Sequence, residues 1–122
     1  MIIVFKHLLE NLLQRVAGSE TAMVVGLDGL VVDSFTRHDN GNLEQLAADS
    51  SSLIKSGLAT TASLSSAALQ ELTLITGGQR IIMRLLTDSY FVMLLLSDSA
   101  NLGLARFELR KAQFDLEKEL AL

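Results

Sequence analysis

The chain has 122 residues, which is enough for a single domain (residues 1–122), and it combines 49 % apolar residues with a net charge of -4. It contains no cysteine, and this excludes a disulfide framework, a cysteine metal ligand and a cysteine nucleophile. The acidic balance argues against a nucleic-acid partner or an anionic membrane partner, because each of these favours a basic face.

No apolar run in the sequence is long enough to cross a bilayer, the longest being residues 90–96. The N-terminal apolar run, residues 1–5, is followed by Lys6, His7 and Glu10, where a signal peptide would carry its apolar centre. We therefore expect a mature, cytoplasmic chain with no membrane insertion.

The first predicted element is an amphipathic helix over about residues 2–16, where apolar residues recur at helical spacing. Gly18 is a stop signal for this helix. A β-hairpin follows, with strands over about 21–27 and 30–35. The Asp28-Gly29 pair between them predicts a tight turn in which both residues have positive φ.

The second predicted helix covers about residues 43–65, and its start has a capping pair in Asn42 and Gln45. Small residues, mainly serine and alanine, fill most of its length, although serine and glycine are poor helix formers. Small residues allow another backbone to come close. This pattern favours packing against a second helix around Gly57, and a serine-rich helix that frays is the alternative.

Three strands are predicted next, over 71–76, 79–87 and 90–96, with short turns between them. Both alternating faces of 90–96 are apolar, so this strand must be covered on both sides and should lie in the centre of the sheet.

The last predicted helix begins at about Asn101 and carries two apolar stripes. The wider stripe packs on the sheet. The thinner one contains Phe107 and Phe114 and needs a partner, either a second dimer or the first helix. The complete order, helix-strand-strand-helix-strand-strand-strand-helix, predicts an α+β fold in which a five-stranded antiparallel sheet has helices on both faces.

No catalytic constellation is present in the sequence. Neither His7 nor His38 sits at an i, i+4 distance from another metal-ligand residue type, and no serine lies in a Gly-x-Ser-x-Gly elbow. Arg80 and Arg84 share one strand face, where they border a helix or solvent, or stabilise an anion. We expect no catalytic residue, no metal and no cofactor, and therefore a protein that is not an enzyme.

The strand over 71–76 is an unprotected edge, because it contains no proline or lysine and its only charge is Glu71. Pairing of this strand and of the preceding helix with their own copies would give a self-complementary, two-fold interface. We predict a homodimer with one continuous sheet. The expected interface residues are Leu46, Ser50, Leu53, Gly57, Leu72, Thr73, Leu74, Ile75 and Thr76.

Three stretches of the chain suggest a family. They are residues 23–34 in the first hairpin, residues 74–96 with their glycine turn, and Asn101-Leu102-Gly103-Leu104-Ala105-Arg106 at the start of the last helix. In this order and spacing they resemble the roadblock/dynein light chain family, in its bacterial and archaeal MglB-like branch. The resemblance covers nearly the whole chain.

The resemblance implies a non-catalytic homodimer that binds a Ras-like small GTPase on its paired central helices. It implies GTPase activation in cell polarity and motility for the MglB-like branch, and scaffold or motor light-chain roles for other relatives. Hydrolysis would take place in the partner's own site. Neither Arg80 nor Arg84 is therefore assigned as an arginine finger.

On the central helix, Leu46 and Leu53 are expected to face the sheet, so the positions turned away from them should meet the GTPase. These are Gln45, Asp49, Ser52, Lys55 and Ser56.

Other functions compete with this prediction. A small-molecule sensor would need convergent polar groups in an apolar pocket, and the low aromatic content of 5 % argues against one. A motor-complex light-chain-type adaptor fits the same fold. A hydrolase lacks a nucleophile and base. The sequence also does not separate a dimer from a dimer of dimers.

Overall fold

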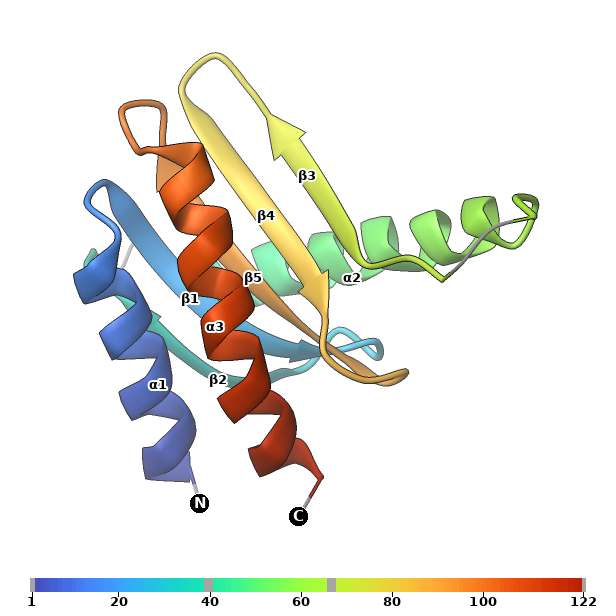
Figure 1. Ribbon diagram of the computed structural model, residues 1–122, viewed down its shortest axis with the longest axis horizontal. Coiled ribbons are helices and arrows are strands. Elements are labelled where there is room, and N and C mark those ends of the chain that lie inside the picture. Colours follow the sequence, from blue (N-terminus) through green and yellow to red (C-terminus); the bar gives the residue numbers. More distant parts are fainter. Residues whose placement is uncertain (1, 39–40, 66–67, 122) are drawn as a thin grey trace.

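The computed structural model describes residues 2–38, 41–65 and 68–121, and within these ranges it has three helices and five strands. In chain order the elements are α1 (Ile2–Arg15), β1 (Ser19–Gly26), β2 (Val31–Thr36), α2 (Leu43–Thr61), β3 (Glu71–Ile75), β4 (Gln79–Leu85), β5 (Tyr90–Ser97) and α3 (Leu102–Leu120). The α+β order predicted from the sequence is confirmed (Figure 1).

The five strands form one antiparallel sheet in the order β2-β1-β5-β4-β3. The predicted central position of β5 is confirmed, because β5 pairs with β1 on one side and β4 on the other. Its side chains are buried on both faces: Val92 and Leu94 belong to one apolar cluster, and Phe91 and Met93 belong to the other. An apolar strand of this kind is stable only where both faces of the sheet are covered.

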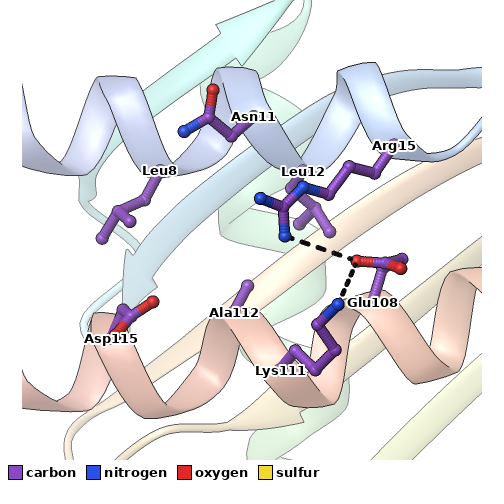
Figure 2. Close-up of a pocket in the computed structure, with 8 residues that line it drawn as sticks. All are labelled: Leu8, Asn11, Leu12, Arg15, Glu108, Lys111, Ala112 and Asp115. Atoms are coloured by element: carbon purple, nitrogen blue, oxygen red, sulfur yellow. Dashed lines mark ion pairs between the residues drawn. The ribbon is translucent and has the colours of Figure 1, made fainter.

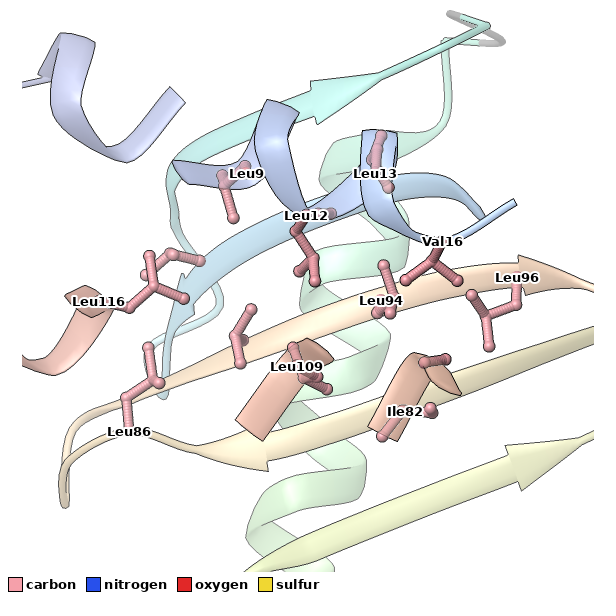
Figure 3. Packing of buried hydrophobic residues seen from close by; sticks show 14 of the residues in the cluster. Leu9, Leu12, Leu13, Val16, Ile82, Leu86, Leu94, Leu96, Leu109 and Leu116 are labelled. Atoms are coloured by element: carbon pink, nitrogen blue, oxygen red, sulfur yellow. The ribbon is translucent and has the colours of Figure 1, made fainter. Parts of the chain in front are cut away.

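One face of the sheet is covered by α1 and α3, which lie side by side and run in opposite directions (Figure 1). Leucines of both helices point at the sheet, among them Leu12 of α1 and Leu109 of α3, and they pack with Leu94 of β5 (Figure 3). This is the larger of the two apolar clusters.

The other face is crossed by α2 alone, which buries Ala47 and Ile54 against Met83, Phe91 and Met93. The C-terminal part of α2 projects past β3, beyond the edge of the sheet (Figure 1). In the described ranges, none of the helices is long and apolar enough to span a bilayer.

The β1–β2 turn differs from the predicted geometry at Asp28. Only Gly29 has a positive φ, +88°, and its N–H donates to the Gly26 carbonyl at 2.9 Å. Asp28 instead accepts a hydrogen bond from the Leu30 N–H through Oδ1 at 3.0 Å. The hairpin is confirmed, but the two-residue turn with two positive φ values is wrong, because the connection spans residues 27–30 and needs only one left-handed residue.

The limits of α2 also differ from those expected, since the helix ends at Thr61 and not near residue 65. Asn42 stands at its N-cap with φ -113° and ψ 15°, and its side chain makes no capping hydrogen bond. Gln45 donates instead to Asp49 Oδ1 at 3.0 Å. The predicted capping pair is therefore wrong, because the backbone of Asn42 lies outside the extended conformation that N-caps typically adopt.

Candidate interaction surface

The outer edge of β3 is the most exposed strand edge with apolar side chains. β3 pairs only with β4, so its other side has no neighbouring strand within the described chain. Leu74 is 42 % exposed and Ile75 is 60 % exposed. Because successive side chains of a strand alternate between faces, Leu74 lies on the α2 side with Leu72, and Ile75 lies on the α3 side with Glu71. An edge of this kind is a template for pairing with another strand.

A charged network holds the start of β3 in place. The Glu71 carboxylate accepts a hydrogen bond from Arg84 Nη1 on β4 and one from Arg106 Nε on α3, each at 3.0 Å. Thr73 donates to the same carboxylate at 2.9 Å, and Gln113 of α3 accepts from Arg84 Nε at 2.9 Å. β3 is thus tied to both the neighbouring strand and the helix above it.

The network also changes the ionisation of Glu71. Burial alone would raise the pKa of this carboxyl, but the hydrogen bonds from Thr73, Arg106 and Arg84 outweigh burial, so the pKa lies below its ordinary value of 4.5. Glu71 is therefore a carboxylate at neutral pH.

On the other face, α2 passes close to the chain that leads into β3. A Cβ at Gly57 would come within 3.0 Å of Leu69 Cδ2 and within 4.0 Å of Leu72 Cδ2. The small residue therefore serves a close approach inside the protomer. The predicted role of Gly57 in a contact between two helices stays a prediction.

A groove of about 270 Å³ lies between the N-terminal part of α2 and the sheet. Its apolar wall includes Leu46 of α2, Ile81 of β4 and Leu95 of β5, and its polar wall includes Gln45 and Asp49. The side of α2 that faces this groove is therefore not covered by the protomer itself.

The structure corrects the expected orientation of Leu53. This side chain is 39 % exposed and does not face the sheet. The stripe of α2 that packs on the sheet contains Ala47, Ser50 and Ser51 with Ile54, and Ser51 donates to the Leu27 carbonyl at 2.6 Å. Hydrophobicity misled the assignment, because alanine and serine fill the space under a helix that lies close to a sheet.

The nine predicted interface residues fall into three groups. Leu53, Leu74, Ile75 and Thr76 are exposed. Half-buried positions are Leu46, Gly57, Leu72 and Thr73. Ser50 is only 1 % exposed and so offers almost no surface to a partner. Thr76 follows β3 and accepts a hydrogen bond from the Gln79 N–H in the β3–β4 turn at 3.0 Å.

All five residues predicted to face a GTPase are exposed on α2: Gln45, Asp49, Ser52, Lys55 and Ser56. The hydrogen bond between Gln45 and Asp49 lies on this exposed side, and Ser52 donates to the Ala48 carbonyl at 3.3 Å. The outer face of α2 is therefore polar, unlike the Leu46 and Leu53 flank beside it.

The two strand arginines have structural partners. Arg80 Nη1 donates to the Asp98 carbonyl at 2.6 Å, and Arg84 takes part in the Glu71 network. The simpler interpretation, that the two arginines border a helix or solvent, fits Arg84, which donates to Gln113 of α3, whereas Arg80 contacts the loop after β5. His7 and His38 are exposed. Among the described residues, no group of three or more histidines, aspartates and glutamates could hold a metal ion.

A second groove, of about 200 Å³, lies between α1 and α3 (Figure 2). Leu8 and Leu12 line one wall. Glu108 lies between two cations, 3.7 Å from Arg15 Nη1 and 3.4 Å from Lys111 Nζ. The contact with Arg15 joins α1 to α3, whereas Lys111 lies on α3 itself, three positions after Glu108.

Comparisons with known proteins agree with this architecture. The family model described as Roadblock/LC7 domain matches residues 6–97. The chain belongs to the Roadblock/LC7 domain family. No curated protein in the comparison matches the chain.

Solved structures of other proteins have the same fold. The Roadblock/LC7 domain from Streptomyces avermitilis has a TM-score of 0.88 and 17 % identity, over 96 % of this chain and 98 % of that one. Myxococcus xanthus MglB has a TM-score of 0.90 and 14 % identity, and the match covers 98 % of this chain and 90 % of that one. The gliding protein MglB of Thermus thermophilus has a TM-score of 0.88 and 18 % identity, and the match covers 96 % of this chain and 88 % of that one. At these identities the likeness shows the fold, and the chain is MglB-like in that sense.

Sequence reasoning missed the link from Glu71 to Arg106. The two residues are 35 positions apart, and only the packing of α3 beside β3 brings them together. The one available signal was a lone charge in an otherwise uncharged strand, because such a charge needs a partner when it is half-buried.

Proposed function

We propose that this Roadblock/LC7 chain is a non-catalytic, cytoplasmic homodimer that binds a Ras-like small GTPase on its α2 face and stimulates GTP hydrolysis by the partner. The observation that carries the proposal is the arrangement of α2. Its apolar flank (half-buried Leu46 and exposed Leu53) and its exposed polar outer face (Gln45, Asp49, Ser52 and Ser56) are open to a partner, and the C-terminal part of the helix extends past the unpaired β3 edge (Figure 1).

The apolar parts of this surface support the dimer. Antiparallel pairing of β3 with a second β3 would extend the sheet and provide hydrogen-bonding partners for both edges. It would also bring the overhanging part of α2 over the partner's sheet (Figure 1). Leu53 and Leu74 would then lose contact with water, which contributes about 25 cal/mol for each Å² of apolar surface buried.

The polar parts support a platform for a second protein. Two antiparallel edge strands are related by a two-fold axis perpendicular to the sheet, so both α2 helices lie on one side of the dimer. Their outer faces then form a continuous polar surface with Asp49 and Lys55 of each copy. The catalytic groups belong to the GTPase, and a regulator acts by favouring the hydrolysis-competent state of its switch loops.

The proposal is tested with the purified chain and the small GTPases that it captures from an extract of its source cells. Captured GTPase should bind the wild-type chain directly, and its GTP turnover should rise when the chain is added. Binding without faster turnover would make the chain a scaffold. Absence of direct binding to any recovered GTPase would overturn the proposal.

A further inference from the structure

The outer face of α3 carries two strongly exposed aromatic rings. Phe107 is 58 % exposed and Phe114 is 70 % exposed. They are seven positions apart and therefore lie on the same side of the helix, two turns from each other. Neither ring belongs to an apolar cluster of the protomer, and neither lines the groove between α1 and α3.

Basic side chains lie between and beside these rings. Arg110 and Lys118 are exposed, and neither makes an ion pair within the described residues. Lys111 lies 5.1 Å from the centroid of the Phe107 ring and 3.4 Å from Glu108. We name the set Phe107, Arg110, Lys111, Phe114 and Lys118 the α3 outer stripe.

The charge of the protein is unevenly distributed. Together α1 and α3 contain six lysines and arginines against five aspartates and glutamates, whereas the rest of the chain has four against nine. The net charge of -4 therefore arises outside these two helices, and the α3 outer stripe is basic on an acidic protein.

This charge pattern opposes a symmetric contact between two copies. A two-fold contact brings the same patch of each copy together, so the cations between the two phenylalanines would meet like charges. An anionic surface, in contrast, complements them. The rings also project from a convex helix, and aromatic rings enter a lipid headgroup layer without needing a matching pocket.

We propose that the α3 outer stripe docks on the surface of an anionic lipid bilayer. Phe107 and Phe114 would lie at the boundary between headgroups and acyl chains, and Arg110, Lys111 and Lys118 would contact the lipid phosphates. One stripe gives weak, reversible binding. The dimer put forward under the proposed function would carry two such stripes on the side opposite α2, and two stripes together would bind a membrane more tightly than one. Only this gain in avidity rests on the proposed function.

Vesicle co-sedimentation of the full chain tests the proposal. The probes are phosphatidylcholine vesicles and matched vesicles that also contain phosphatidylglycerol. The wild-type chain should sediment with the anionic vesicles, sediment far less with the neutral ones, and be released as salt is raised. The variant R110Q/K118Q should bind about 25-fold more weakly, since each cation near an anionic surface contributes about fivefold.

The variant F107S/F114S should lose most of its binding to anionic vesicles and keep the far-UV circular dichroism spectrum and melting temperature of the wild type, because both rings are exposed. The matched control is Leu30→Ser, which changes a side chain that is 69 % exposed on the β1–β2 turn. This control should bind anionic vesicles as the wild type does.

Three outcomes overturn the proposal: no sedimentation of the wild type with anionic vesicles, equal sedimentation with neutral ones, or unchanged binding by F107S/F114S. If light scattering instead shows that F107S/F114S halves the mass of a wild-type assembly that does not bind vesicles, the stripe packs against a second copy and the lipid proposal is wrong. Changes at Asp49 test the GTPase proposal separately, so the two failures are distinguishable.

Discussion

Arg106 of α3 donates a hydrogen bond from Nε to the Glu71 carboxylate of β3 at 3.0 Å, and thereby joins the edge strand to the helix layer. The second oxygen of Glu71 accepts from Arg84 of β4 at 3.0 Å. One carboxylate therefore fixes β3 from two directions, while the outer edge of the strand remains open. A strand held in this way is ready to pair without first having to be ordered.

Replacing Glu71 by glutamine should destabilise the fold. The amide keeps the shape of the side chain but leaves Arg84 and Arg106 without their anion, and we expect a loss of about 1–3 kcal/mol in the free energy of unfolding. Urea unfolding at neutral pH measures it. The control Asp98→Asn removes an exposed carboxylate that makes no ion pair within the described chain, and it should change stability by less than about 0.5 kcal/mol. An equal loss in both variants would contradict the role of the network.

The contribution of Glu71 should depend on pH with a definite sign. The pKa of Glu71 in the folded chain lies below 4.5, its ordinary value, which also describes the unfolded chain. The stabilisation is therefore fully present above the unfolded pKa and is lost as pH falls through the folded pKa. The difference in unfolding free energy between the wild type and Glu71→Gln should shrink below pH 4.5. A difference that grows on acidification would refute this sign.

A charge at Leu74 should prevent the proposed dimer. Leu74→Lys places an ammonium group on the α2 side of the β3 edge, where pairing with a second copy would bury it. Size-exclusion chromatography with light scattering should report a monomer. The control is Val32→Lys, a similar change at a side chain that is 37 % exposed on β2, the opposite edge strand. A dimer that survives Leu74→Lys and is lost in Val32→Lys would move the interface to the other edge.

Charge reversal on the outer face of α2 should weaken GTPase binding. We expect the double variant D49K/K55E to bind the captured GTPase at least about tenfold more weakly, because interface charges determine both attraction and orientation. Surface plasmon resonance gives the dissociation constant, and light scattering should show that the oligomeric state is unchanged. Asp88→Lys, at an exposed position between β4 and β5, is the control. Full retention of binding by D49K/K55E would place the GTPase elsewhere.

Substitution of Gly18 should destabilise the connection between α1 and β1. Gly18 has φ +86°, and a Cβ there would come within 3.0 Å of both Ala100 Cβ and Ser97 Oγ. We expect Gly18→Ala to lower the free energy of unfolding by about 1–3 kcal/mol. Gly77→Ala is the matched control, because a Cβ at Gly77 meets no atom within 4 Å. In chemical denaturation, Gly18→Ala should unfold at a clearly lower denaturant concentration than Gly77→Ala. Equal unfolding midpoints would contradict the predicted clash at Gly18.

The sequence predicted most of the architecture because the apolar patterns are strong. Residues 90–96 are apolar on both faces, and β5 is indeed central. The Gly77-Gly78 and Asp28-Gly29 pairs marked two of the three hairpins, although the turn at Asp28-Gly29 needs one left-handed residue and not two. Patterns of this kind report burial directly, and for this reason the order of the elements followed from them.

The details of α2 could not be predicted in the same way. Ser50 and Ser51 pack on the sheet, whereas Leu53, the more hydrophobic residue, is 39 % exposed. Hydrophobic periodicity assumes that the largest apolar side chains lie inside. A helix that lies close to a sheet reverses this order locally, because only small residues fit beneath it. The Glu71 network also depends on contacts between distant segments, which no local pattern encodes.

The two edges of the sheet are not equivalent. The β2 edge has a register irregularity opposite Val24 and Val25, and Lys6 of α1 donates to the Ser34 carbonyl of β2 at 2.6 Å. Both features oppose the addition of a strand. If copies join through β3, the outer edges of the pair are both β2. Extension of the sheet would therefore stop at two copies. The assembly is self-limiting, and a chain whose β3 edge can pair with another strand avoids forming a fibre.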